Sequence, residues 1–443
     1  MHLGGELSAL ADRTCRPPFA RRRQGADLQG RTGSDGRHRI QGRSCELAYW
    51  KYILQNARMI ERTGLLAQLA DGLRLSPVTA ILGPRQCGKT TLAREFGRRH
   101  KAVYFDLEDP EDQARLSNPR LVLEPLRGVV ILDEIQRRPE LTQLLRVLVD
   151  RRPLPCRFII LGSASPDLMQ KASDTLAGRI HFVDMSGFSL TELKPSSQLQ
   201  LWIRGGFPPS FLAETDDASH VWRTNYVRTF LERDMPLLGV RVAPEMLRRF
   251  WSMIAHYHGQ IWNASEIGAS LGVSHHTTRH YLDLLTGAFI VRQLPPWFEN
   301  VGKRVVKSPK VFIRDSGLLH FLMNIPDLPA LQSHPKLGAS WEGFALEQLL
   351  ALTSERNAYF WATQSRAELD LLIQARGKRW GFEFKYQDAP VMTKSLHLSM
   401  ADLKLEQAWI VYPGRASYAV HEQVEVVPLI TALDKMRELA KSS

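Results

Sequence analysis

The sequence has 443 residues, which is enough for two or three domains of ordinary size. Its hydrophobic content of 44% and charged content of 23% are those of an ordinary globular protein that can build a sizeable core. The net charge of +12 favours encounter with polyanions such as nucleic acid, although the surface arginines of many basic proteins account for it equally well.

Membrane and secreted classes are excluded by the apolar pattern. No run approaches the ~20 apolar residues that are needed to span a bilayer. Near the amino terminus, Arg21–Arg23 stand where a secretory signal would carry its apolar segment. The cysteines show no metal-ligand spacing and no paired framework, and they suit a reducing compartment. We therefore expect a cytoplasmic protein with no membrane partner.

Residues 1–58 differ in composition from the rest of the chain. They are rich in Gly, Arg and Ser and show no apolar period. They are either a flexible basic arm that contacts nucleic acid or sequence upstream of the natural start, which would then be Met59; we favour the second. From Met59 onward, apolar and polar residues recur at helical spacing. We expect no catalytic chemistry in residues 1–58 and a first domain at residues 59–195.

A phosphate-binding pattern follows the first predicted strand. Residues 77–82 (PVTAIL) are a short apolar run between Pro and Gly, as in a buried parallel strand. The pattern G-x-x-x-x-G-K-T comes directly after it, and its glycines let backbone N–H groups point at phosphate oxygens. Lys89 would reach the β- and γ-phosphates, and Thr90 would offer its hydroxyl to Mg²⁺. We predict that ATP binds to Gly83, Pro84, Arg85, Gln86, Cys87, Gly88, Lys89, Thr90 and Thr91.

The run GVVILDE (128–134) predicts a second strand that ends in two carboxylates. Asp133 would hold Mg²⁺ through water, and Glu134 would polarise the water that attacks the γ-phosphate. A small-molecule kinase with the same loop is disfavoured, because this acidic pair suits water activation and no Arg-rich lid follows. Together the two motifs predict Mg²⁺-dependent ATP hydrolysis.

Two further residues are candidates for sensing the γ-phosphate. Ser163 ends a third strand-like run, RFIILGSAS (157–165); the alternative is that it caps the next helix. Arg179 could reach a γ-phosphate in its own subunit or in a neighbouring one, and it could equally be a surface arginine. Arg85, inside the loop, is a further candidate.

Five segments in order, GPRQCGKTTLAR, YFDLED, ILDEIQRRPEL, LGSAS and LAGR, resemble AAA-type ATP-binding proteins with a DUF4143 C-terminal region. The resemblance runs over residues 59–425. It implies an α/β fold, with a P-loop NTPase core on a parallel sheet, a helical DNA-binding-like segment and a nuclease-like C-terminal fold. We place the second segment at residues 196–325 and the third at residues 326–443.

Residues 260–294 predict a helix–turn–helix. The first helix is Ala264–Leu271, the turn lies at Gly272, and the second helix runs to about Leu285, followed by two β-like runs. Helix–turn–helix followed by a strand pair is the winged-helix order. The alternative is that the fold serves only protein packing. The side chains placed where base-reading residues would lie are Ser274, His275, His276, Thr277, Thr278 and Arg279.

The C-terminal region carries a second set of charged residues. Glu383 and Lys385 alternate along a predicted strand and so share a face, and Asp370 lies on a neighbouring strand. Two carboxylates could hold Mg²⁺ while the lysine positions water. This order resembles the PD-(D/E)XK nuclease superfamily, in which Glu342 matches the helix glutamate of resolvase-like members. The alternative is a salt-bridge cluster that no longer cuts DNA.

Two functions remain open from the sequence. In the first, an ATPase acts on or with DNA, and its cycle moves the winged-helix and nuclease-like parts, with Glu134, Arg179, Asp370, Glu383 and Lys385 as catalytic residues. In the second, the nucleotide switches assembly with protein partners, and the C-terminal fold is inert. Possible partners are therefore DNA, a second copy of the chain, or another protein.

Overall fold

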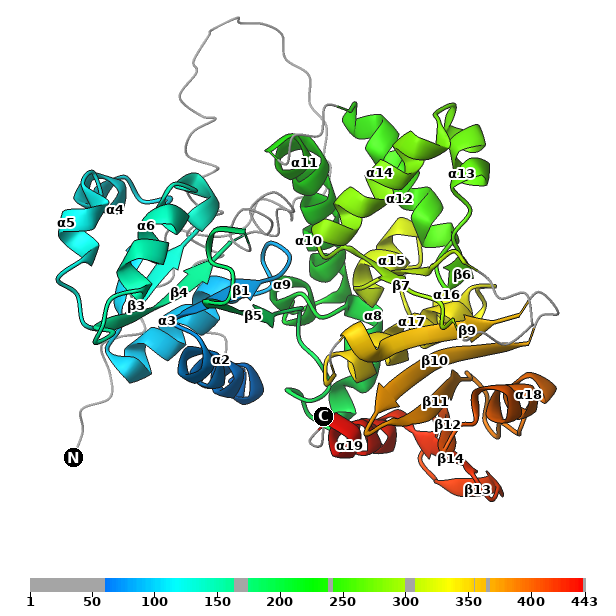
Figure 1. Cartoon of the computed structure of the whole chain (residues 1–443). Coiled ribbons are helices and arrows are strands. Elements are labelled where there is room, and N and C mark those ends of the chain that lie inside the picture. The colour runs from blue at the N-terminus through cyan, green and yellow to red at the C-terminus, as the bar shows by residue number, and fades with distance from the viewer. Residues whose placement is uncertain are drawn as a thin grey trace, which may run out of the picture. The chain divides into compact units, whose positions relative to one another are not determined.

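The computed structural model describes residues 60–162, 174–237, 242–298, 307–353, 355–363 and 367–440. The predictions for residues 1–58, for a start at Met59 and for Ser163 lie outside these ranges. The residues from Ile60 onward form one compact unit, coloured from blue to red along the chain in Figure 1.

The first part is built on a parallel sheet, as the sequence predicts. Its strand order is β2-β3-β4-β1-β5, and every neighbouring pair is parallel. The burial of all five residues of β1 agrees with its continuous apolar sequence. The strands are β1 (Val78–Leu82), β2 (Val103–Asp106), β3 (Gly128–Asp133), β4 (Cys156–Leu161) and β5 (Ile180–Asp184).

Helices cover both faces of this sheet (Figure 1). Leu69 of α2 and Phe96 of α3 pack in the hydrophobic cluster that holds Ile81 of β1. Leu145 of α6 packs in the opposite cluster with Val78. The alternate residues of β1 therefore face two separate cores. The elements are α2 (Thr63–Leu75), α3 (Lys89–His100), α4 (Pro110–Arg115), α5 (Pro119–Leu123), a 3₁₀ turn (Ile135–Arg137) and α6 (Leu141–Val149).

The middle part is mainly helical. The predicted helix–turn–helix is present, because α13 covers Ala264–Leu271 and α14 covers His275–Gly287, with Gly272 between them in the left-handed conformation. A small antiparallel sheet in the order β6-β8-β7 accompanies it; β6 precedes the two helices, and β7 and β8 follow them. The other elements are α8 (Gln198–Arg204), α9 (Pro208–Phe211), α10 (Asp216–Thr229), a π-helical turn (Phe230–Asp234), α11 (Met235–Leu237), α12 (Pro244–His256), β6 (Gln260–Ile261), β7 (Val291–Leu294), β8 (Lys310–Ile313), α15 (Ser316–Leu322) and α16 (Leu328–Gln332), with a 3₁₀ turn at Pro195–Ser197.

The C-terminal part is a mixed sheet flanked by helices (Figure 1). Its strand order is β13-β14-β12-β11-β10-β9, with β10 antiparallel to β11 and β12 parallel to it. The elements are α17 (Leu337–Leu350), a 3₁₀ turn (Glu355–Asn357), β9 (Ala358–Ala362), β10 (Glu368–Ala375), β11 (Lys378–Phe384), α18 (Lys394–Leu403), β12 (Gln407–Tyr412), β13 (Tyr418–His421), β14 (Val424–Pro428) and α19 (Leu429–Ala440).

The α/β class and the parallel sheet of the first part are confirmed. The predicted apolar runs become strands within a residue or two of their expected ends, as at β1 and β3. Among the described residues, no helix has the length and apolar character that crossing a membrane requires.

Candidate active site

The phosphate-binding loop lies between β1 and α3, and its structure explains why the two glycine positions of the sequence pattern are occupied by glycine. A Cβ on Gly83 would lie 2.0 Å from the carbonyl oxygen of Met185, so no larger residue fits there. Gly88, the residue before α3, has φ of +101°, which favours glycine. The loop therefore turns sharply into the amino terminus of α3, where a helix presents unpaired N–H groups and the positive end of its dipole.

Lys89 lies inside the curve of this loop. Its ammonium donates hydrogen bonds to the carbonyl oxygens of Gly83 and Pro84, both at 2.8 Å, and the residue is only 7% exposed. The buried ammonium is thus held by carbonyl groups of the loop whose N–H groups are predicted to surround phosphate. Thr91 follows on α3 with an exposed side chain, and the Cys87 side chain is fully buried.

Asp133 and Thr90 meet at the carboxyl edge of the sheet. The Thr90 hydroxyl donates to Asp133 Oδ2 at 2.8 Å, and the N–H of Glu134 donates to Asp133 Oδ1 at 2.9 Å. Tyr104, which the sequence analysis missed, donates its hydroxyl to the same Oδ2 at 2.5 Å. Burial and the neighbouring Asp133 carboxylate raise the pKa of Tyr104 far above its ordinary value, so Tyr104 remains a donor. A hydroxyl beside a buried carboxylate is an oxygen donor set that fits Mg²⁺ carried by a nucleotide.

Glu134 follows Asp133 in the left-handed conformation, with φ of 57°. Its carboxylate accepts a hydrogen bond from the Gln136 side chain. Burial raises the pKa of Glu134 above the ordinary glutamate value, and the negative charge of Asp133 raises this pKa further. A raised pKa makes a carboxylate a better acceptor of a proton from water.

Arg62 binds the backbone of the loop, and this residue was not predicted from the sequence either. Its guanidinium donates to the carbonyl oxygens of Cys87 at 3.2 Å, Ser186 at 3.1 Å and Gly187 at 2.8 Å. It also forms a two-bond ion pair with Glu192, at 2.5 Å and 2.9 Å, and both side chains are about nine-tenths buried. Arg62 therefore ties the phosphate-binding loop to the segment that follows β5.

Two other loop side chains contact the middle part. Arg85 forms an ion pair with Asp234 of the π-helical turn at 2.6 Å. Gln86 accepts a hydrogen bond from the indole N–H of Trp222 at 3.1 Å. In the structure these two side chains thus bind protein groups, and the prediction that they contact a nucleotide stays a prediction.

Arg179 lies at the amino-terminal ends of the strands, whereas the loop lies at their carboxyl-terminal ends. It directly precedes β5, and its carbonyl accepts a hydrogen bond from Val78 at the start of β1, whereas the loop follows the end of β1. Five strand residues span roughly 16 Å. Its guanidinium is paired with the half-exposed Asp150 at 2.6 Å. This placement does not support contact with a γ-phosphate in the same subunit; a role in a neighbouring subunit stays a prediction.

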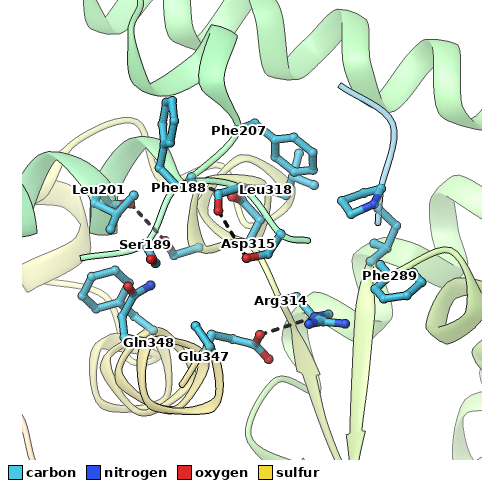
Figure 2. Close-up of a pocket in the computed structure, with 18 residues that line it drawn as sticks. Phe188, Ser189, Leu201, Phe207, Phe289, Arg314, Asp315, Leu318, Glu347 and Gln348 are labelled. Atoms are coloured by element: carbon cyan, nitrogen blue, oxygen red, sulfur yellow. Dashed lines mark hydrogen bonds and ion pairs between the residues drawn. The ribbon is translucent and has the colours of Figure 1, made fainter. Parts of the chain in front are cut away.

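A cavity of about 50 Å³ lies beside the loop (Figure 2). Pro84 and Phe289 line it, together with Arg314 and Glu347, which form an ion pair at 3.4 Å. The volume holds a few water molecules and is too small for a nucleoside. We therefore assign no ligand to it.

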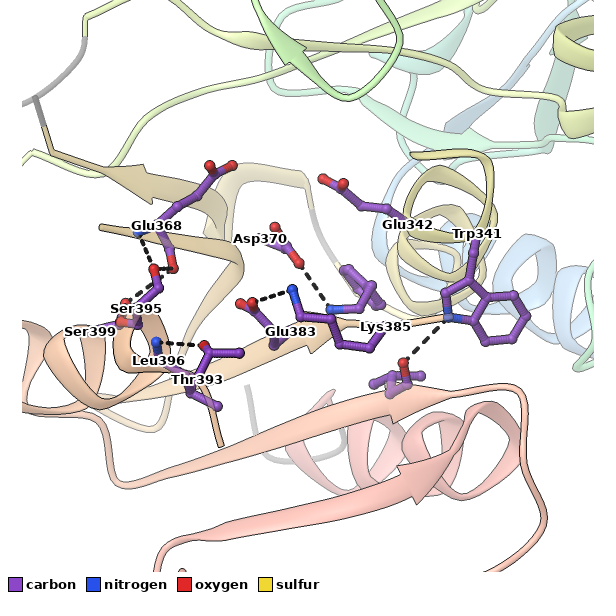
Figure 3. Close-up of polar contacts among 12 residues, drawn as sticks. Trp341, Glu342, Glu368, Asp370, Glu383, Lys385, Thr393, Ser395, Leu396 and Ser399 are labelled. Carbon is purple, nitrogen blue, oxygen red and sulfur yellow. Dashed lines mark hydrogen bonds and ion pairs between the residues drawn. The ribbon is translucent and has the colours of Figure 1, made fainter. Parts of the chain in front are cut away.

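The C-terminal carboxylates also come together (Figure 3). Asp370 on β10 accepts a hydrogen bond from the backbone N–H of Phe384 at 2.9 Å, and Lys385 pairs with Glu383 at 2.7 Å, so the predicted shared face is confirmed. Glu342 extends from α17 toward these strands. Burial raises the pKa of Glu342 and of Glu383 well above the ordinary glutamate value.

A lysine that the sequence analysis did not single out lies among these carboxylates. The ammonium of Lys310, on β8, is 2.9 Å from Glu342 Oε1 and 3.4 Å from Asp370 Oδ1, and it also pairs with Glu368. Burial alone would lower the pKa of Lys310, but the three carboxylates outweigh burial and raise that pKa. In the described ranges, no group of three or more His, Cys, Asp or Glu side chains is arranged to hold a metal. The prediction that Glu342, Asp370 and Glu383 hold a metal stays a prediction.

The helix–turn–helix presents part of its predicted surface. Ser274, His275, His276 and Arg279 are exposed at the start of α14. Ser274 caps that helix by accepting the N–H of Thr277 at 3.1 Å. Thr278 is fully buried and bonds the Ser274 carbonyl, so its expected position on the contact surface is wrong.

Comparison with known proteins divides the chain into three matched segments. A family described as an AAA domain matches residues 75–194, a domain of unknown function, DUF8612, matches residues 196–328, and DUF4143 matches residues 337–431. Uncharacterized proteins of Mycobacterium bovis and Mycobacterium tuberculosis are each 49% identical over 370 residues, which is 84% of this chain and 84% of theirs.

Likenesses to solved structures are weaker. A Walker-type ATPase of Pyrococcus abyssi is 16% identical over 60% of this chain and 97% of its own, with a TM-score of 0.41. A DNA replication initiation factor is 15% identical over 51% of this chain and 75% of its own, with a TM-score of 0.24. Likenesses of this size carry no argument about function.

Proposed function

Because the chain belongs to the family of AAA-type ATP-binding proteins with a DUF4143 C-terminal region, we propose that it binds ATP with Mg²⁺ and hydrolyses it at the Gly83–Thr90 loop. One observation carries the proposal. The buried ammonium of Lys89 lies inside the loop, with the Thr90–Asp133 pair and Glu134 beside it at the same edge of the sheet.

The proposed reaction is in-line attack of water on the γ-phosphorus, which breaks its bond to the β–γ bridging oxygen and yields ADP and phosphate. Lys89 would move from the loop carbonyls to the phosphate oxygens and stabilise the charge that develops there. Asp133 holds the Thr90 hydroxyl in position, and Glu134 would orient the attacking water and accept its hydrogen bond. Mg²⁺, when bound, supplies positive charge at the β- and γ-phosphate oxygens.

We further propose that the ATPase acts with DNA through a winged helix formed by α13, α14, β7 and β8. Its support is the exposed polar and basic start of α14 and the net charge of +12. In this proposal the C-terminal part has a PD-(D/E)XK-like fold, and a second copy of the chain could bring its Arg179 to the nucleotide.

The second candidate is a nucleotide-dependent switch that assembles with protein partners, with an inert C-terminal part. The Arg85–Asp234 and Gln86–Trp222 contacts support it, because they join the loop directly to the middle part. Lys310 among the carboxylates supports the inert C-terminal part.

The test is the rate of Mg²⁺-dependent ATP hydrolysis with duplex, single-stranded or branched DNA and without DNA, while the DNA is followed on a gel. Lys89→Ala should lose ATP binding or turnover, and Glu134→Gln should bind ATP but not hydrolyse it. Lys101→Ala, an exposed lysine after the other end of α3, is the matched control and should be unchanged. Normal turnover in Lys89→Ala would refute the site, and turnover indifferent to every DNA would favour the switch.

A further inference from the structure

Lys310 is bound in a way that is unusual for a lysine. Its side chain is 3% exposed, and its ammonium contacts the carboxylates of Glu342, Glu368 and Asp370. An ammonium has three N–H donors, so one acceptor is present for each donor. The ring of Phe360, with its centroid 5.8 Å from the nitrogen, adds a favourable aromatic contact. The surroundings therefore satisfy this cation completely.

The backbone fixes the position of this ammonium. Lys310 is the first residue of β8, the central strand of its sheet, and it is paired with Ile261 of β6 on one side and Leu294 of β7 on the other. The three carboxylates come from elsewhere, one from α17 and two from β10. The side chain thus crosses from the middle part into the carboxylate cluster of the C-terminal part.

A divalent cation does not fit beside this ammonium. Such an ion needs carboxylate oxygens at roughly 2.0–2.6 Å, and here the oxygens of Glu342 and Asp370 face Lys310. Glu383 is already paired with Lys385, and its other oxygen is buried with no hydrogen-bond partner among the described residues. A metal would have to displace the Lys310 ammonium or approach it in a buried site, where like charges repel strongly.

We propose that Lys310 is the resident cation of this cluster. On the PD-(D/E)XK-like fold proposed above, on which this step rests, its ammonium takes the place of a divalent metal. The wild-type cluster therefore binds no divalent cation and cuts no phosphodiester by a metal-dependent route. Its charge instead joins β8 to α17 and β10. This inference does not depend on ATP hydrolysis.

The test is binding of Mn²⁺ to the nucleotide-free full-length protein, followed by the electron paramagnetic resonance signal of the free ion. Wild type and Glu383→Gln should titrate alike, because the cluster holds no metal in either. Lys310→Met keeps most of the side-chain volume but removes the charge. It should gain one site that binds Mn²⁺ at least ten-fold more tightly than anything in wild type, and Lys310→Met/Asp370→Asn should lose it.

The matched control is Lys378→Met on β11, whose exposed ammonium pairs with Glu406 at the surface, and it should gain no site. Any weak binding at the phosphate loop is common to all variants and cancels in the comparison. Wild-type binding that falls ten-fold or more in Glu383→Gln would overturn the proposal, even if Lys310→Met does not fold. A folded Lys310→Met that gains no site would overturn it too.

Discussion

Arg62→Met should loosen the phosphate-binding loop, because Arg62 binds backbone groups of the loop and of the segment after β5. The substitution keeps a side chain of similar length and removes the ion pair with Glu192 and the donors to Cys87, Ser186 and Gly187. Both charged side chains are about nine-tenths buried. Breaking a buried ion pair on one side costs about 3–5 kcal/mol, because the remaining charge has no partner.

Hydrogen exchange measured by mass spectrometry on peptides covering β1 and the loop suits this prediction, since a chain of several parts need not unfold in one step. A loss of about 3–5 kcal/mol in the local opening free energy would speed exchange on the order of a hundred-fold to several thousand-fold. Binding of a non-hydrolysable ATP analogue, measured by calorimetry, should weaken at the same time, because the loop must be ordered again before it can bind.

Arg74→Met is the matched control on the same helix. Arg74 pairs with Asp71 at the surface, where both side chains are more than half exposed. Exposed pairs contribute little, so exchange in the loop should stay at the wild-type rate. An Arg62→Met variant that exchanges and binds within two-fold of wild type would exclude this role of Arg62. Glu192→Met should cost less stability when it is added to Arg62→Met than it does alone, because the unpaired charge is then gone.

Two further predictions concern a buried histidine and Arg179. Burial lowers the pKa of His320 to about 4, so below pH 6.5 the unfolded chain binds a proton that the folded chain does not. At pH 5 this costs about 2 kcal/mol of stability. When unfolding by denaturant is compared at pH 7.5 and pH 5, His320→Gln should therefore lose less stability on acidification than wild type. An equal loss would exclude His320 as a cause of the pH dependence. The control is His397→Gln, at an exposed position. Arg179→Ala should hydrolyse ATP within two-fold of wild type in dilute protein, whereas a large loss that grows with protein concentration would assign Arg179 to a neighbouring subunit.

Local features were predictable from the sequence. The strand at β1 and the phosphate-binding loop after it depend on short-range rules, on glycines at tight turns and on an apolar run, so β1 and the loop lie where they were predicted. The helix Ala264–Leu271 was predicted with its observed ends, because Asn263 caps it and Gly272 terminates it. The position of Arg179 could also have been predicted from the sequence. A residue that precedes one parallel strand lies at the opposite end of the sheet from a loop that follows the neighbouring strand.

Long-range partners were not predictable in this way. Lys310 stands at the start of a β-like run, where a lysine normally faces solvent, and its acceptors lie more than thirty residues away. Arg62 is a single arginine before a helix, with partners in the phosphate-binding loop and after β5. Nothing periodic marks either residue, because their burial is decided by how distant segments pack.

Helix α17 constrains which parts of this chain can be separated in evolution. Its Glu342 pairs with Lys310, and its Glu347 pairs with Arg292 of β7 at 2.9 Å, so both acidic residues of one helix face cations of the preceding segment. A gene fusion or deletion that separated the two segments near residue 330 would break both ion pairs and expose their surroundings to water, so each product would lose contacts that stabilise it. We therefore expect DUF8612 and DUF4143 to occur together in one chain in relatives that keep these residues.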